Sequence, residues 1–68
     1  MKISARNVLD GVVKEVKKGS TTAHVTIDVN GSILTASITN ESVDQLGLKP
    51  GSKAKAVIKS SDVMIAVD

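Results

Sequence analysis

Hydrophobic and polar residues alternate along residues 22–29, which is the clearest pattern in the chain. One set of alternate positions is apolar: Ala23, Val25, Ile27 and Val29. The other set is polar: Thr22, His24, Thr26 and Asp28. Because the side chains of a strand point alternately to its two faces, this pattern predicts a strand with one buried face and one exposed face.

Four further runs rich in β-branched and aliphatic residues lie between turn-forming residues and predict four more strands. They span residues 12–18, 32–39, 53–59 and 63–67. The strongest turn signal is Asn30-Gly31, because a type I′ turn needs two positive φ angles and these two residue types tolerate them. We therefore expect residues 22–29 and 32–39 to form a hairpin.

One short helix is expected directly after the third strand. Thr39 or Asn40 can cap its first turn, which Glu41 favours, and Gly47 is suited to end it in a left-handed conformation. Five short strands with one helix after the third predict an all-β fold, a five-stranded OB-like Greek-key barrel in a single domain over residues 1–68. A five-stranded sandwich is the structural alternative.

The first and last predicted strands differ from the second because they are apolar on both faces. Val12 and Val16 share one face of the first strand while Val13 lies on the other, and residues 63–67 (VMIAV) are apolar throughout. A chain of 68 residues without Phe, Tyr, Trp or Cys has a thin core and no second core to cover both faces. We therefore expect the terminal strands to contact other subunits. For the first strand, the alternative is that Gly11 marks a bend that turns it around the barrel.

Charge and composition narrow the function classes. The net charge of +2 is ordinary, and without Phe, Tyr or Trp the chain lacks the base-stacking platform of single-strand nucleic-acid binders. No apolar run approaches the roughly 20 residues of a membrane span, and residues 1–4 show no export signal, which favours the cytoplasm. An enzyme is not expected: the one histidine, His24, lies on a polar strand face, and the carboxylates form no acid–base motif.

Two polar segments near the chain ends combine a cation with small hydroxyl side chains. They are residues 4–7 (SARN) and residues 59–62 (KSSD), each at a strand boundary. A third candidate is the helix start, residues 39–42 (TNES), whose first N–H groups lack partners within the helix. A deprotonated oxyanion accepts hydrogen bonds and donates none, so hydroxyls, N–H groups and a cation suit it. Taken alone, each segment is better explained as an ordinary solvated turn.

The joint pattern of these segments resembles the molbindin (Mop) family of small molybdate-binding proteins and domains. The resemblance rests on residues 3–7 (ISARN) near the start and residues 57–65 (VIKSSDVMI) near the end. The middle of the chain also fits, with residues 36–39 (ASIT), Ser42-Val43, Leu46-Gly47 and Pro50-Gly51. The resemblance covers essentially the whole chain, and the combination is far more specific than the SARN segment alone.

The resemblance implies an OB-like barrel in a homohexamer, a trimer of dimers, that stores molybdate or tungstate between its subunits. One subunit would contribute Ser4, Ala5 (main chain only), Arg6, Lys59 and Ser60, and a neighbour would contribute Thr39 and Ser42. A second kind of site near threefold axes is also implied, for which the turn of Gly19, Ser20 and Thr21 offers N–H groups. No cofactor and no direct protein ligand to a metal are expected. The rival interpretations are a nucleic-acid-binding OB domain and a protein-interaction module without a small ligand.

Overall fold

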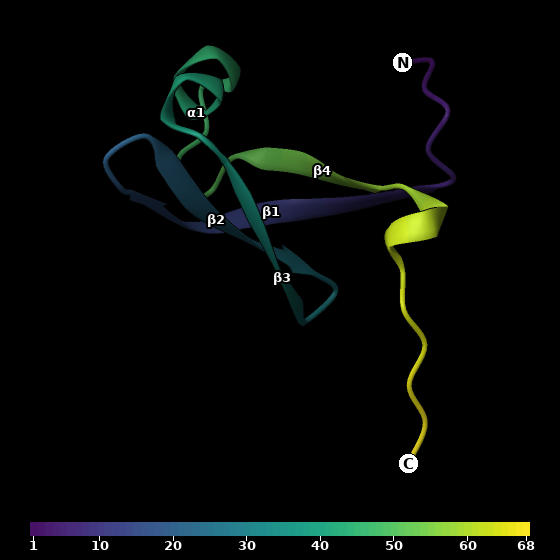
Figure 1. Cartoon of the computed structure of the whole chain (residues 1–68). Helices are drawn as coiled ribbons and strands as arrows, with labels where there is room; N and C mark the ends of the chain where they lie inside the picture. The colour runs from purple at the N-terminus through teal and green to yellow at the C-terminus, as the bar shows by residue number, and fades with distance from the viewer.

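The computed structural model describes all 68 residues and consists mainly of β-structure (Figure 1). The four strands are β1 (Asn7–Lys18), β2 (Thr22–Val29), β3 (Ser32–Thr39) and β4 (Lys53–Ile58). The helix α1 (Asn40–Leu46) follows β3, and a single 3-10 turn, η1 (Ser60–Asp62), follows β4. None of these helical segments has the length and apolar character that crossing a membrane requires.

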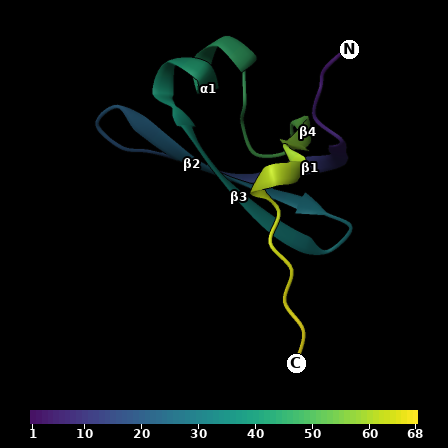
Figure 2. The same ribbon diagram turned by 45° about the vertical axis from the view of Figure 1, so that its right-hand side comes forward.

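The strands form one twisted antiparallel sheet in the order β3-β2-β1-β4 (Figures 1 and 2). The predicted hairpin of β2 and β3 is confirmed, with pairing from Thr22 opposite Thr39 to Val29 opposite Ser32. Its turn has φ angles of 51° at Asn30 and 91° at Gly31. Both angles are positive, as the type I′ signal in the sequence required.

Strand β1 is longer than predicted, because its first half has a partner of its own. Residues 7–12 pair with β4 and residues 12–18 pair with β2. Gly11 lies where β1 changes partner, and a Cβ atom there would lie 2.5 Å from Cγ2 of Ile27 and 2.8 Å from the carbonyl oxygen of Asp28. The break in pairing register lies beyond it, between Val13 and Glu15. Gly11 therefore permits a close approach of strands, while the β-bulge that adds local twist is at Lys14.

The core is small and aliphatic, and it lies between the inner face of the sheet and α1. The buried side chains are Val13, Ala23, Val25, Ile27 and Val43. Three of them belong to the face of β2 that the alternating pattern predicted to be buried, and His24 is exposed on the other face. Helix α1 begins after the Thr39 cap and ends at Gly47, whose φ is 64°, both as predicted. The local sequence signals in the middle of the chain therefore predicted the correct boundaries of β2, β3 and α1.

The prediction of a fifth strand over residues 63–67 is wrong for the chain on its own. Strand β4 ends at Ile58, η1 follows, and the remaining residues run away from the sheet without pairing with any strand (Figures 1 and 2). We call residues 63–68 the C-terminal arm. The apolar pattern of a strand was present, but a strand also needs a neighbour for its N–H and C=O groups, and this chain supplies none. The four-stranded sheet is consequently open rather than a closed five-stranded barrel, and a single sheet is not a sandwich.

Candidate functional site

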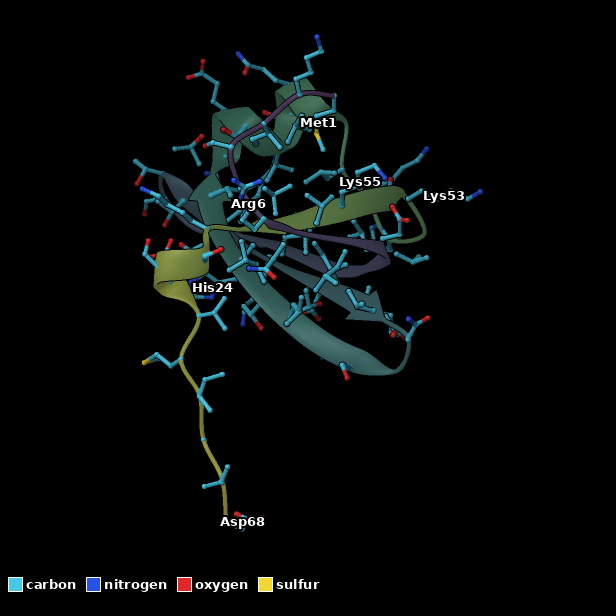
Figure 3. All side chains as sticks on the ribbon, turned by 90° about the vertical axis from the view of Figure 1, so that its right-hand side faces the viewer. Met1, Arg6, His24, Lys53, Lys55 and Asp68 are labelled. Atoms are coloured by element: carbon cyan, nitrogen blue, oxygen red, sulfur yellow. The ribbon has the colours of Figure 1, made fainter.

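The two polar segments predicted from opposite ends of the sequence lie side by side in the fold. Asn7, the first residue of β1, pairs with Ile58, the last residue of β4, and its Nδ2 donates a hydrogen bond of 3.2 Å to the Ile58 carbonyl oxygen. The segment with Arg6 therefore enters the sheet where the segment with Lys59 leaves it. Figure 3 looks onto this part of the molecule, with Arg6 close to the end of β4 and to η1. We call it the Asn7 end of β1.

Apart from Asn7, the polar side chains of the predicted site at this end are exposed and have no hydrogen-bond or ion-pair partner within the chain. Ser4, Arg6, Lys59 and Ser60 are exposed, and Ala5 is partly buried. The two ion pairs of the chain lie elsewhere and leave both Arg6 and Lys59 unpaired. Two unpaired cations beside serine hydroxyls form a surface that suits an anion, because a bound anion gains charge-assisted hydrogen bonds without first displacing a carboxylate.

The helix start that was predicted as the third segment is already organised by its own hydroxyl groups. Oγ1 of Thr39 accepts a hydrogen bond of 3.0 Å from the backbone N–H of Ser42, which caps the helix. The Thr39 hydroxyl also donates to Oγ of Ser42 at 2.8 Å. The proton of the Ser42 hydroxyl then remains free to be donated outward. Thr39 thus orients Ser42, and Ser42 carries the available donor.

The helix start and the Asn7 end lie at opposite ends of β1 in a single chain (Figure 1). Thr39 pairs with Thr22, and the next residue of β2, Ala23, pairs with Lys18, the last residue of β1. We call this the Lys18 end. The strand between the two ends is 12 residues long, which corresponds to roughly 36–40 Å of extended chain. One chain therefore does not bring all the predicted site residues together, and a site that uses both groups needs two copies.

The turn of Gly19, Ser20 and Thr21 is bound to the helix start, a connection that the sequence did not reveal. Asn40 Nδ2 donates to the carbonyl oxygen of Gly19 at 3.0 Å, and the Asn40 backbone N–H donates to that of Thr21 at 2.9 Å. The Gly19 N–H is itself bonded to the Thr22 carbonyl oxygen at 2.7 Å. Gly19 therefore has no free N–H for an anion, whereas Ser20 and Thr21 are exposed. No local signal marked Asn40 as a bridge, because its partner is 21 residues away.

A cleft of about 870 Å³ beside the β2–β3 turn is a further polar surface, and its charged lining residues are Asp10, Asp28, Lys14, Lys53 and Lys55. Lys55 Nζ lies 2.5 Å from Oδ1 of Asp10, and this hydrogen bond, together with the lysine charge, lowers the pKa of the Asp10 carboxyl. Oδ1 of Asp28 accepts a hydrogen bond of 2.7 Å from the N–H of Gly31. Two carboxylates line this cleft, so it suits a dianion less well than the Asn7 end does. No group of three or more His, Cys, Asp or Glu side chains is placed to hold a metal ion.

Comparison with known proteins defines first the class of domain and then the family. The family model of the TOBE domain matches residues 3–65. Molybdenum-pterin-binding protein 1 of Clostridium pasteurianum is 50% identical over 66 residues, which are 96% of this chain and 97% of that protein. A probable molybdenum-pterin-binding protein of Haemophilus influenzae is 42% identical over 69 residues, which cover 100% of both chains. The chain therefore belongs to the TOBE domain family and, within it, to the small Mop proteins, or molbindins.

Solved structures agree with this assignment. A molybdate-binding protein from Sporomusa ovata has a TM-score of 0.94 and 42% identity, covering 98% of this chain and 100% of its own. MopII from Clostridium pasteurianum has a TM-score of 0.90 and 46% identity, covering 97% and 100%. ModG, a cytoplasmic molybdate-binding protein solved with molybdate bound, has a TM-score of 0.89 and 46% identity, covering 94% of this chain and 46% of its own. The predicted family and a mainly β fold with one short helix are confirmed, and these relatives are binding proteins.

Proposed function

We propose that this protein binds molybdate or tungstate reversibly and stores it in the cytoplasm, without catalysing a reaction. The observation that carries the proposal is the meeting of Arg6 and Lys59, two unpaired cations from opposite ends of the chain, at the Asn7 end of β1. The names of the relatives support the choice of ligand, since the similar proteins from Clostridium pasteurianum and Sporomusa ovata are called molybdenum-pterin-binding and molybdate-binding.

The residue types at this place match the hydrogen-bonding needs of a tetrahedral dianion. The hydroxyls of Ser4 and Ser60 and the main chain of Ala5 offer neutral donors, and Arg6 and Lys59 offer positively charged donors. Molybdate and tungstate are fully deprotonated at neutral pH and only accept hydrogen bonds. A protonated phosphate also has a donor, and this set of side chains offers it no carboxylate; only a serine hydroxyl oxygen could accept from it, since Arg6 and Lys59 only donate. Discrimination against phosphate follows from this difference, and discrimination against sulfate depends on the size of the enclosed cavity.

The site is completed by a second copy of the chain in this proposal. Thr39 and Ser42 of a neighbour face Arg6 and Lys59, because a single chain holds the two groups at opposite ends of β1. A homohexamer built as a trimer of dimers provides such contacts, with residues 1–68 acting as one oxyanion-binding domain. Ser20 and Thr21 are the exposed residues that remain available for a second kind of site near a threefold axis.

Isothermal titration of the purified protein with molybdate, tungstate, sulfate and phosphate tests the proposal. We expect heat of binding with molybdate and tungstate at micromolar protein, with weaker binding of sulfate and phosphate. Absence of heat with both metal oxyanions would overturn the function. Binding of single-stranded oligonucleotide that weakens with salt, in place of oxyanion binding, would favour the rival nucleic-acid interpretation.

A further inference from the structure

The two charged donors of the candidate site have free side chains on a backbone that is held in place. Arg6 directly precedes β1, and Lys59 directly follows β4. The Lys59 carbonyl oxygen accepts a hydrogen bond of 2.9 Å from the Asp62 N–H, which closes η1. The Lys59 side chain itself makes no capping hydrogen bond and no ion pair. The position of its ammonium group therefore depends on where the backbone of residues 58–62 is held.

One side chain joins the two segments directly, and it belongs to Asn7. Its Nδ2 donates the 3.2 Å hydrogen bond to the carbonyl oxygen of Ile58, the residue before Lys59. No other side-chain hydrogen bond links residues 1–7 to residues 58–68. Asn7 is also partly buried, whereas Arg6 and Lys59 are exposed. The Asn7 amide is therefore a contact within the chain, placed between two side chains that have none.

Arg6 and Lys59 occupy the next positions beyond the end of the ladder between β1 and β4. Asn7 and Ile58 are the last paired residues of that ladder, and continuing the same register by one position sets Arg6 opposite Lys59. Like charges directly opposite each other on paired strands are destabilising. The end of a ladder also opens most readily, because its last residues have paired neighbours on one side only. Without a further contact, the strands would tend to separate here and to carry the two cations apart.

We propose that Asn7 is a positioning residue of the oxyanion site, whose side-chain amide holds Arg6 and Lys59 together against their mutual repulsion before an anion arrives. This inference rests on the proposed function, because it assigns Asn7 a role in that same site. Donors that are already in place lose less conformational freedom when a ligand binds, so the amide raises affinity without touching the anion. An aspartate of the same shape would lack the N–H donor and would add a negative charge beside the anion.

A double-mutant cycle separates positioning from a general contribution to stability. The four proteins are the natural chain, Asn7→Ala, Lys59→Ala and the chain with both substitutions, and each is titrated with molybdate by calorimetry. The matched control is Ser52→Ala, made in the natural and in the Lys59→Ala background. The Ser52 hydroxyl accepts a hydrogen bond of 3.1 Å from the Lys49 N–H, so the control also removes one side-chain bond to the backbone, but before β4 begins rather than after it ends.

We expect Asn7→Ala to weaken molybdate binding about 3- to 10-fold when Lys59 is present, the effect of losing one neutral hydrogen bond. In the Lys59→Ala background the same substitution should change affinity by less than about twofold, because the cation that Asn7 holds is gone. Ser52→Ala should leave affinity unchanged in both backgrounds. Unchanged affinity of Asn7→Ala, or a loss by the same factor with and without Lys59, would overturn the positioning role.

Amide hydrogen exchange without any oxyanion gives a second, independent readout. The Asp62 N–H, which is bonded to the Lys59 carbonyl oxygen, reports whether the backbone around Lys59 stays in place. Its exchange should become several-fold faster in Asn7→Ala and should not change in Ser52→Ala. Unchanged exchange in Asn7→Ala overturns the positioning role whether or not an oxyanion binds. Faster exchange supports that role, and if the natural chain then fails to bind molybdate, only the proposed function is overturned.

Discussion

At the Lys18 end of β1 the polar groups are bonded within the chain, whereas at the Asn7 end the polar side chains of the site are not. Lys18 Nζ lies 2.6 Å from Oδ1 of Asp44, and Thr39 and Ser42 share two hydrogen bonds. Arg6 and Lys59, by contrast, have no carboxylate partner. Both ends carry a lysine and serine side chains, so composition alone does not separate them. The two ends differ in whether the folded chain supplies a hydrogen-bond or ion-pair partner for these side chains. A polar side chain without such a partner is available to a ligand or to a second subunit.

The largest expected effect is at the Asn7 end, where Lys59→Ala removes a charged donor from the proposed anion. Loss of a charge-assisted bond to an enclosed anion should weaken binding by about 1.5–3 kcal/mol, roughly 10- to 150-fold. The matched control is Lys18→Ala, which removes a lysine that already has a partner and should leave affinity unchanged. Titration calorimetry with molybdate compares the two. Equal affinity of Lys59→Ala and the natural chain would make Lys59 an ordinary surface lysine.

A mixing experiment tests whether the Asn7 end of one copy and the Lys18 end of another form one binding site. Ser42→Ala removes the free hydroxyl donor of the helix start, so chains with Ser42→Ala and chains with Lys59→Ala are each expected to bind molybdate weakly. A mixed oligomer contains some sites with Lys59 from one chain and Ser42 from the other, and these sites should regain the natural affinity. Calorimetry of the co-refolded mixture checks this. If the mixture binds only as weakly as its two components, the two ends do not share a site.

A smaller effect is expected on folding at the Lys18 end, where Thr39→Ala removes the helix cap. Loss of a threonine cap costs about 1 kcal/mol of unfolding free energy. Thr39→Ser should retain most of it, because a serine hydroxyl makes the same bonds. Thr35→Ala, on the same strand and equally exposed, serves as the control. Urea unfolding at one fixed protein concentration measures all three, since stability of an oligomer depends on concentration. A Thr39→Ala chain as stable as the control would show that the cap contributes nothing.

The smallest expected effect is a loss of stability when Asp10 is replaced. Asp10 is the carboxylate of β1 nearest to the Asn7 end, and it is paired with Lys55. The hydrogen bond and charge of Lys55 lower the pKa of Asp10 in the folded protein. The pair therefore contributes stability above the unfolded pKa of an aspartate, about 3.9, and this contribution is lost as the pH falls through the lower folded pKa. Both side chains are exposed, so the effect is small. Asp10→Asn should lower the melting temperature slightly at neutral pH, and the difference from the natural chain should vanish in acid. A difference that persists at low pH would contradict this assignment.

Much of the middle of the chain was predictable because its signals are local. The turn at Asn30 and Gly31 and the helix end at Gly47 depend on φ angles that few residue types adopt, and the structure has them there. The buried face of β2 follows from a period of two that needs no knowledge of distant residues. The early start of β1 at Asn7 was missed, because that half of the strand pairs with β4, whose residues lie 41 to 51 positions further along the sequence.

The structure of the C-terminal arm and the composition of the candidate site could not be predicted from local sequence pattern. Residues 63–67 have the composition of a strand, and their apolar side chains predict a contact with another subunit. Whether they form a strand depends on a neighbour that this chain does not provide. Likewise, the sequence determined that residues 4–7 and 59–62 carry cations and hydroxyls. Only the tertiary structure decided that these two segments meet, through the pairing of Asn7 with Ile58, and that the helix start lies at the other end of β1. The physical reason is the same in each case: turn and cap energies belong to a few adjacent residues, whereas a shared site is made by pairing between residues that are far apart in the chain.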